Sequence, residues 1–311
     1  MLISIVVPAY REEKNIPEFV SRVVTILEKI TGEFEIIFSI DPSPDRTEEV
    51  VLECRAQDQR IKLLRFSRRI GQPMATLGGL HYSSGEAVIV MDVDLQGPPE
   101  LIPEMIERWR DGFDVVYAQR RNREGETWLK RVVSALGYRL INKIADVNIP
   151  PNTGDFRLMS RQVVDALLQM HERHRFLRGM VAWLGFAQTA VKYSRAGRAA
   201  GRTKYNLRKM LSLAWNASIS FSPAPLRVSL MAGVFIALLG ACHGVYAIIH
   251  SLVIHDTVPG WTTLVVLLSL IGGWILVSIG VLGEYVAKLF EEVKGRPLYV
   301  LAKRVNLPDR K

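Results

Sequence analysis

The chain has 311 residues, a formal net charge of +9 at pH 7 and a pI of about 9.6. This length favours two parts rather than one domain, and the positive charge favours an anionic partner such as a phosphorylated substrate or an anionic lipid. No nucleic-acid-binding module is visible in the sequence, so nucleic acid is not expected as a partner. Cys54 and Cys242 fall in different contexts and are not expected to pair, which fits a reducing compartment. Gly-x-Ser-x-Gly, phosphate-loop and Cys-x-x-Cys motifs do not occur, which argues against hydrolase, ATPase and redox functions.

Up to about residue 225, short apolar runs alternate with amphipathic, charged stretches. The apolar runs predict strands at 3–7, 35–40, 61–66, 87–91 and 115–118. Helical periodicity occurs at about 14–30, 44–57, 72–83, 99–111 and 160–184. Strands that alternate with helices predict an α/β fold with a mostly parallel, doubly wound sheet covered on both faces. In such sheets ligands bind at the carboxyl ends of the strands.

Polar side chains follow three of these predicted strands. Pro8 ends the first strand, Tyr10 offers an aromatic face, and Glu12 lies where a helix dipole favours an acid. After the second strand, Asp41 could accept a hydrogen bond from a base or a ribose, whereas Asp45 has the pattern of a helix cap.

The fourth predicted strand is followed by Asp92 and Asp94, which leave its end on the same side. Gln96 adds an amide oxygen two residues later, and Gly-Pro-Pro at 97–99 prevents an immediate helix. Such oxygens are ligands that Mg²⁺ or Mn²⁺ accepts, and the ion in turn can hold a phosphate. A polar turn that only closes the strand is the alternative that Asp-x-Asp alone leaves open.

The composition changes sharply near residue 225. The stretches 228–253 and 262–283 contain no Asp, Glu, Lys or Arg. Each is long enough to cross a bilayer core of about 30 Å as a helix, although a buried hairpin of a soluble protein is the alternative. The basic residues that flank the pair are Arg227, Lys288, Lys294, Arg296, Lys303 and Arg304. By the positive-inside rule, they predict a multi-pass protein of the inner (plasma) membrane with its N-terminal domain and both termini in the cytoplasm.

A helical period at 205–225, with Trp215 as an interface anchor, predicts a helix on the membrane surface, although an ordinary packed helix has the same period. The predicted organisation is therefore a cytoplasmic domain at 1–204, an interfacial helix at 205–225, two transmembrane helices within 226–287, and a cytoplasmic tail at 288–311. Glycines in both spans permit close helix contact, which leaves a homo-oligomer open.

Three motifs resemble those of the inverting nucleotide-sugar glycosyltransferases of family 2, which have the GT-A fold. They are Pro-Ala-Tyr-x-Glu-Glu at 8–13, Asp-x-Ser-x-Asp-x-Thr at 41–47 and Asp-x-Asp-Leu-Gln-x-Pro-Pro at 92–99. Within that family the chain is similar to the polyprenyl-phosphate sugar transferases, which include dolichyl-phosphate mannose synthase and the bacterial bactoprenol glucosyltransferases. The two-span hairpin matches the bacterial branch, as do the segments 154–158, 201–205 and 291–299. Two departures are Arg11, where the family usually has Asn, and Ile40-Asp41-Pro42, where it usually has Asp-Asp-Gly.

The resemblance implies inverting transfer of a hexose to an undecaprenyl-type polyprenyl phosphate at the cytoplasmic membrane face, with glucose from UDP-glucose as the favoured donor. The implied metal ligands for Mg²⁺ or Mn²⁺ are Asp92, Asp94 and Gln96, and the implied catalytic residues are Asp155, which resembles the family's proposed base, and Asp94. The candidates for binding the nucleotide sugar are Pro8, Tyr10, Glu12, Asp41, Asp92 and Lys204. The candidates for binding the acceptor phosphate are Arg120, Lys130, Arg131, Ser134 and Arg157.

Three alternatives stay open at this point. The same reaction could use GDP-mannose or a modified amino sugar, because the residues around Asp41 depart from the usual base contact. A membrane scaffold or transporter subunit would need no chemistry, but the intact acidic motifs speak against it. A processive synthase is disfavoured by the missing Gln-x-x-Arg-Trp signature and by the two predicted spans.

Overall fold

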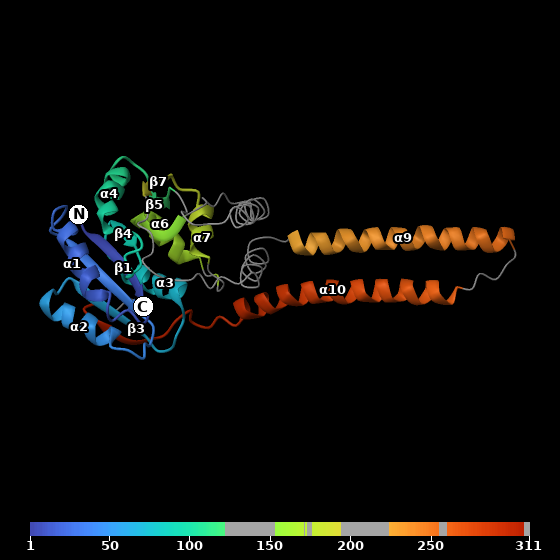
Figure 1. Cartoon of the computed structure of the whole chain (residues 1–311), viewed down its shortest axis with the longest axis horizontal. Helices are drawn as coiled ribbons and strands as arrows, with labels where there is room; N and C mark the ends of the chain where they lie inside the picture. The colour runs from blue at the N-terminus through green and yellow to red at the C-terminus, as the bar shows by residue number, and fades with distance from the viewer. Residues whose placement is uncertain (122–152, 171, 173–175, 194–223, 255–259, 308–311) are drawn as a thin grey trace. The chain divides into compact units, whose positions relative to one another are not determined.

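The structure is a computed structural model that describes residues 1–121, 153–170, 172, 176–193, 224–254 and 260–307. These residues fall into two compact units. The first contains the described residues up to 193 together with 296–307, and the second contains those from 224 to 295. Figure 1 labels the elements of both units.

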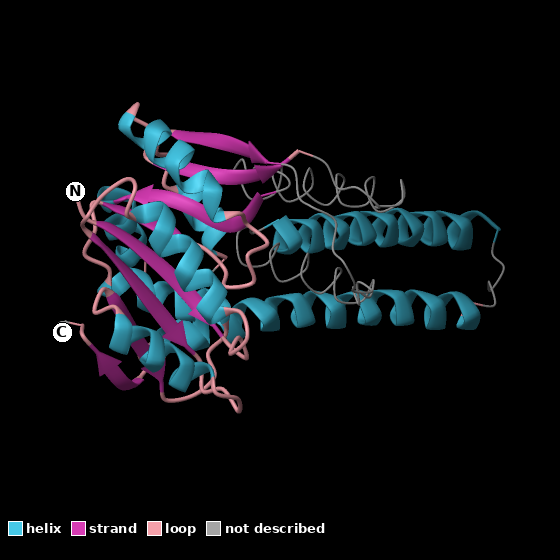
Figure 2. Ribbon diagram, turned by 60° about the vertical axis from the view of Figure 1, so that its left-hand side comes forward, coloured by secondary structure: helices cyan, strands magenta, loops and turns pink. Residues whose placement is uncertain are grey.

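The first unit is a sheet with helices on both of its faces (Figure 2). The strands in its described residues are β1 (Ile3–Ala9), β2 (Phe34–Ile40), β3 (Ile61–Phe66), β4 (Ala87–Val90), β5 (Val115–Arg120), β6 (Thr153–Ser160), β7 (Gln188–Tyr193) and β8 (Leu301–Val305). The helices are α1 (Ile16–Leu27), α2 (Thr47–Gln57), α3 (Gln72–Tyr82), the 3₁₀ helix η1 (Pro99–Leu101), α4 (Ile102–Arg110), α6 (Arg161–Gln169) and α7 (Leu177–Trp183). The predicted α/β fold is confirmed.

The strands lie in the order β7-β5-β6-β4-β1-β2-β3-β8. The central strands β4, β1, β2 and β3 are parallel neighbours, as predicted. The sheet is nevertheless mixed, because β6 runs antiparallel to both β4 and β5, and β8 runs antiparallel to β3. The sequence pattern predicts none of β6, β7 and β8; in β6, for example, Asp155 and Arg157 interrupt the apolar run.

Side chains on the two faces of β1 pack against the helices on the two sides of the sheet. Ile3, Ile5 and Val7 belong to a core that also contains apolar residues of α1, α2 and α4. Val6 belongs to a second core, with residues of α3, α6 and α7. Both faces are covered, so every residue of β1 is buried, and its sequence is apolar at every position except Ser4 rather than alternating.

The stretch 160–184, predicted as one helical stretch, contains the two helices α6 and α7. Met170, directly after α6, has an extended backbone, and Phe176, directly before α7, is also outside the helical region. This interruption lets α7 begin at a new position, with Arg178 as its second residue.

The second unit is a pair of long helices, α9 (Ala224–Ile254) and α10 (Trp261–Val293), which lie side by side (Figures 1 and 2). Ser229 donates a hydrogen bond to Ser278 across the pair, with an Oγ–Oγ distance of 2.8 Å. Close approach also occurs at Gly233, where an added Cβ would lie 3.3 Å from Nε1 of Trp274. The helical pair agrees with the hairpin predicted for 226–287.

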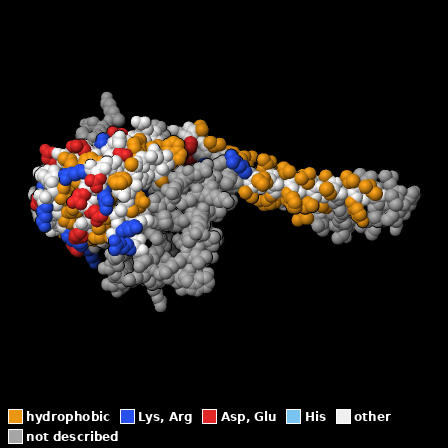
Figure 3. Space-filling view, turned by 90° about the horizontal axis from the view of Figure 1, so that it is seen from above, with side chains coloured by type: hydrophobic (Ala, Val, Ile, Leu, Met, Phe, Trp, Pro, Cys, Tyr) orange, Lys and Arg blue, Asp and Glu red, His pale blue; other side chains and the backbone are white. Residues whose placement is uncertain are grey.

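The described residues of this helical pair expose many large apolar side chains, which are seen on the face shown in Figure 3. Leu230 is 68% exposed and Leu276 is 71% exposed. Within the described residues, Leu270–Val293 is long and apolar enough to cross a membrane, with a mean hydropathy of 1.7, and Leu226–Cys242 is a shorter apolar segment. That the two helices cross a membrane therefore stays a prediction.

The chain returns to the sheet after α10. The N–H of Ser67 donates to the carbonyl of Val300 at 2.8 Å, and β8 pairs with β3. The Tyr299 ring packs edge-on against Phe66, and its hydroxyl lies 3.1 Å from Nδ1 of His81. The segment predicted as a tail at 288–311 thus includes the end of α10 and an edge strand of the first unit.

Candidate active site

The candidate site lies at the carboxyl ends of β1, β2 and β4, which are neighbours in the sheet. Tyr10, Asp41 and Asp92 follow these strands directly or within two residues. The antiparallel strand β6 adds a fourth side chain, Asp155. Val90 on β4 pairs with Arg157 on β6. Asp92 comes two residues after Val90 and Asp155 two residues before Arg157, so the two acids lie at the same end of this antiparallel pair. The predicted acidic motif and the predicted base are thereby brought together from distant parts of the sequence.

The loop after β4 turns sharply. The N–H of Gln96 donates to Oδ1 of Asp94 at 3.1 Å, and Leu95 has a left-handed backbone with φ of 54°. At Gly97 an added Cβ would lie 2.5 Å from the ring of Phe156. The absence of a side chain at Gly97 therefore allows this loop to pack directly on β6 beside Asp155.

The electrostatics of the site show an excess of negative charge. Burial, followed by the charges of Asp155 and Asp94, raises the pKa of Asp92 to about 6, although Arg178 acts in the opposite direction. Burial is also the main cause that raises the pKa of Glu12, and the charge of Asp94 adds to it. A cation placed among these carboxylates would relieve their repulsion.

This environment fits a divalent cation. Two carboxylates and an amide, as predicted for Asp92, Asp94 and Gln96, are oxygen ligands of the kind that Mg²⁺ and Mn²⁺ take. In the described part of the chain, no three His, Cys, Asp or Glu side chains are grouped closely enough to hold a metal by themselves. Water or substrate phosphate would have to complete the coordination, as is usual for Mg²⁺. The assignment of these three ligands stays a prediction.

Asp155 is held by two side chains that the sequence motifs did not indicate. Nε of Arg178 donates to Oδ1 of Asp155 at 2.7 Å, and this forms an ion pair. Nε2 of Gln72 donates to Oδ1 of Asp92 at 2.8 Å and to Oδ2 of Asp155 at 3.3 Å. Burial would raise the pKa of Asp155, but the hydrogen bond and charge of Arg178 and the charge of Arg157 outweigh it and lower the pKa. Asp155 is therefore ionised at neutral pH.

Arg157 follows Asp155 by two residues on β6 and is only 7% exposed. Burial lowers the pKa of Arg157 to about 10, against the opposing effect of Asp155, so the guanidinium remains charged at neutral pH. Its Nη2 donates to the carbonyl of Gly154 at 3.2 Å. The predicted contact of Arg157 with an acceptor phosphate stays a prediction.

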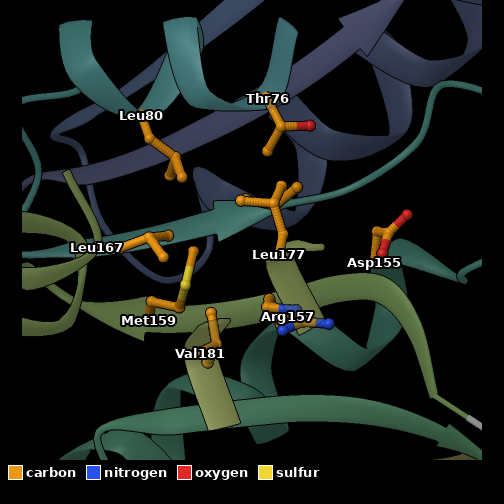
Figure 4. A pocket seen from close by; sticks show the side chains of 9 residues that line it. Thr76, Leu80, Asp155, Arg157, Met159, Leu167, Leu177 and Val181 are labelled. Carbon is orange, nitrogen blue, oxygen red and sulfur yellow. The ribbon is translucent and has the colours of Figure 1, made fainter. Parts of the chain in front are cut away.

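Asp155 and Arg157 border a cavity of about 10 Å³ whose remaining wall is mainly apolar (Figure 4). The apolar side chains include Leu80, Leu177 and Val181. A cavity of this size holds about one water molecule, so neither a sugar nor a phosphate fits inside it. Substrate would therefore reach Asp155 from its exposed side.

On the predicted donor side, Asp41 is 3% exposed, and its carboxylate accepts hydrogen bonds from the N–H groups of Ile70 and Gly71, at 3.0 and 2.9 Å. It thus holds the loop that leads into α3. The Tyr10 ring lies under the guanidinium of Arg69, 4.1 Å from its centroid. The predicted contacts of Asp41 and Tyr10 with a nucleotide stay predictions, and so does that of Pro8, which lies within β1.

On the predicted acceptor side, Nε of Arg120 donates to the hydroxyl of Tyr193 at 3.1 Å. Gln119, Arg120, Arg121 and Lys192 line an open hollow at the ends of β5 and β7. The other candidates lie outside the described residues: Lys130, Arg131, Ser134 and Lys204.

Gln72 and Arg178 could have been found only in part from the sequence. Gln72 opens the helix that follows β3, so its place near the carboxyl edge follows from the predicted strand and helix. Arg178 had no such signal, because the predicted continuous helix at 160–184 hides the start of α7.

Comparison with known proteins shows to which family the chain belongs. The profile of Glycosyl transferase family 2 matches residues 4–168, and that of the GtrB C-terminal hairpin matches residues 224–289. The uncharacterized glycosyltransferase sll0501 of Synechocystis is 42% identical over 300 residues, which are 96% of this chain and 94% of the relative. The prophage-derived bactoprenol glucosyl transferase of Shigella flexneri is 42% identical over 303 residues, which are 97% of this chain and 98% of the relative.

A crystal structure of glucosyl-3-phosphoglycerate synthase from Mycobacterium tuberculosis with Mn²⁺, uridine diphosphate and phosphoglyceric acid is also similar. It is 20% identical, with a TM-score of 0.47, and the match covers 70% of this chain and 76% of that chain. The family profile spans more than half of the 311 residues, and the curated relatives are similar along nearly the whole chain. The chain therefore belongs to glycosyltransferase family 2 and carries a GtrB-type C-terminal hairpin.

Proposed function

We propose that the protein transfers glucose from UDP-glucose to a polyprenyl phosphate. The observation that carries this proposal is the 42% identity with bactoprenol glucosyl transferase over 97% of the chain, which includes both the sheet unit and the hairpin. The charged groups at the carboxyl edge of the sheet suit the same chemistry, because the donor brings a diphosphate and the acceptor a phosphate.

In the proposed reaction, an oxygen of the lipid phosphate attacks the anomeric carbon of glucose. The bond between that carbon and the β-phosphate oxygen breaks, UDP leaves, and the configuration at the anomeric carbon is inverted. A phosphate monoester has a second pKa near 6, so the acceptor is already largely deprotonated at neutral pH. A strong base is therefore not required, and ionised Asp155 would mainly orient the reacting groups.

A divalent cation, when bound, would neutralise charge that develops on the leaving diphosphate. Asp92, Asp94 and Gln96 are the residues proposed to hold it. The raised pKa of Asp92 supports this assignment, because burial and, after it, the charges of Asp155 and Asp94 disfavour the ionised carboxylate, which a cation would stabilise. Both Mg²⁺ and Mn²⁺ suit this set of oxygen ligands.

The helical pair is proposed to cross the membrane twice. An apolar surface of this extent is unusual for a protein in water, and lipid would cover it. α9 has 31 residues, so at a rise of about 1.5 Å per residue it can cross a core of about 30 Å. The described residues up to 193 and those from 296 to 307 belong to one compact unit, which supports the proposal that both ends of the pair lie on the same side of the membrane. The basic residues that flank the pair favour the cytoplasm for that side.

The test uses the full chain, purified in detergent and supplied with undecaprenyl phosphate. Radiolabelled UDP-glucose, GDP-mannose and an amino-sugar nucleotide are compared, each with Mg²⁺, with Mn²⁺ and with EDTA. Metal-dependent appearance of label in the lipid extract with UDP-glucose is the expected result. Transfer from another donor alone would replace glucose in the proposal, and the absence of label with every donor would refute it.

A further inference from the structure

Both carboxylate oxygens of Asp155 receive a hydrogen bond from a side chain. Oδ1 accepts from Nε of Arg178 at 2.7 Å, and Oδ2 accepts from Nε2 of Gln72 at 3.3 Å. The same Gln72 nitrogen donates to Oδ1 of Asp92 at 2.8 Å. The three partners come from separate elements, because Asp155 lies on β6, Arg178 on α7 and Gln72 at the start of α3.

These contacts restrict how Asp155 can move. A carboxylate that is held at both oxygens cannot rotate about its terminal torsion without breaking a hydrogen bond. The contact with Arg178 is charge-assisted, which makes it stronger than a neutral hydrogen bond. The Asp155 side chain is nevertheless 29% exposed, so a substrate can still reach it.

Gln72 suits a bridge between two acids. Its amide group supplies two hydrogens and carries no charge, so it can donate to both carboxylates at once. A direct approach of Asp92 and Asp155 would be opposed by like-charge repulsion, and the charge of Asp155 already acts on Asp92. The bridge therefore links an acid on the proposed metal side to the acid on the proposed acceptor side.

We propose that Gln72 and Arg178 are positioning residues that hold Asp155 in its reactive orientation and at a fixed place relative to Asp92. Neither residue needs to touch the substrate. This inference rests on the proposed glucosyl transfer, and it assigns Asp155 the role of a fixed, ionised acceptor of hydrogen bonds rather than that of a mobile base. Loss of either residue should therefore slow the chemical step only as long as Asp155 is present.

The first test removes the ion pair with Arg178→Met in the full-length protein. A misplacement of about 1 Å in a catalytic group can cost about 10²-fold in rate, so kcat should fall by roughly that factor. The KM for UDP-glucose should change less than about twofold, since the ion pair that the substitution removes is made with Asp155 and not with a residue proposed to bind the donor. Arg178→Lys keeps the charge and should recover part of the lost kcat.

The deciding measurement is a double-mutant cycle with Asp155→Asn. If Arg178 acts through Asp155, the variant that combines both substitutions should be no slower than Asp155→Asn alone. The same non-additivity is expected for Gln72→Leu combined with Asp155→Asn. A structural role would instead slow the enzyme by the same factor whether or not Asp155 is present.

Two matched controls lie outside the site. Arg22→Met removes an ion pair with Glu100, with a distance of 2.6 Å and a similarly exposed arginine. Gln162→Leu removes a hydrogen bond between a glutamine amide and Asp114. Both controls should retain kcat within about twofold, with melting temperatures close to those of the corresponding site variants.

The outcomes separate this inference from the proposed function. An active wild-type enzyme with an equally active Arg178→Met variant would overturn the positioning role and leave glucosyl transfer intact. Additive losses in both cycles would overturn it as well. A wild-type enzyme that transfers no sugar would overturn the proposed function, and the positioning role with it.

Discussion

Gly97→Ala should damage both stability and catalysis, because the new methyl group would meet a buried ring. An ideal Cβ at this position lies 2.5 Å from Cδ1 of Phe156, and two further ring atoms lie within 3.3 Å. Phe156 is 5% exposed and belongs to the larger hydrophobic core, so its ring is packed among other core residues. Either the loop at 95–98 or the strand β6 must therefore move.

The magnitude follows from the cost of overpacking. Forcing an extra methyl into a packed core typically costs about 1–3 kcal/mol. For a domain of about 200 residues, each kcal/mol lowers the melting temperature by roughly 2–4 °C, so the expected drop is about 2–12 °C. Phe156 lies between Asp155 and Arg157 on β6, so a shift of its backbone also displaces Asp155. A displacement of about 1 Å would lower kcat by up to about 10²-fold.

The assay measures the melting temperature and the turnover of each variant in detergent. It includes one control substitution and one variant background that should remove the clash. Gly32→Ala is the matched control, because an added Cβ there meets no atom within 4 Å. Phe156→Leu removes part of the ring, so adding Gly97→Ala to that background should cause little further loss. The reasoning is refuted if Gly97→Ala melts and turns over like the wild type. It is equally refuted if the substitution costs as much in the Phe156→Leu background.

Three further predictions follow from the site and its surroundings. Asp94→Asn should lower transfer by about 10²–10³-fold with an unchanged melting temperature. The control Asp111→Asn, at an exposed position, should leave transfer unchanged. Wild-type turnover in Asp94→Asn would exclude Asp94 as a metal ligand. Arg11 has a left-handed backbone with φ of 61°, a conformation that Asn tolerates better than Arg. Arg11→Asn should therefore raise the free energy of unfolding by up to about 1 kcal/mol. A lower melting temperature in this variant would contradict the prediction. The pKa of Asp155 is lowered in the folded state, so the stability gained from its ionisation is present above about pH 4 and is lost as the pH falls further. The difference in melting temperature between wild type and Asp155→Asn should therefore narrow below about pH 4, and a constant difference down to pH 3 would argue against the ion pair with Arg178.

The sequence predicts the features of this protein that depend on local pattern. The central strands β1 to β4 were predictable from apolar runs, and the acidic loop at 92–96 from its place at the end of one of them. Arg11 stands where the family usually has Asn. The structure explains the preference for Asn, because the backbone at this position is left-handed and Asn tolerates that conformation better than Arg.

Contacts between distant segments could not be read from local pattern. The bridge from Gln72 to Asp155 spans 83 residues, and it forms only because β6 inserts antiparallel beside β4. Asp41 is predicted to contact a nucleotide, and the structure adds that its carboxylate accepts hydrogen bonds from two backbone N–H groups 29 and 30 residues further on. The hydrogen-bond partners of the Asp41 carboxylate depend on the position of the separate loop at 70–71. The sequence around Asp41 does not specify the position of that loop.

The return of the chain to the sheet after the hairpin bears on how the proposed reaction works at a membrane. With β8 paired to β3, described residues from both sides of the hairpin in the sequence belong to the sheet unit. The proposed acceptor is confined to the membrane, so an enzyme whose own hairpin is proposed to lie in that membrane meets the acceptor phosphate at a raised effective concentration. The hairpin would thereby contribute to catalysis as well as to anchoring.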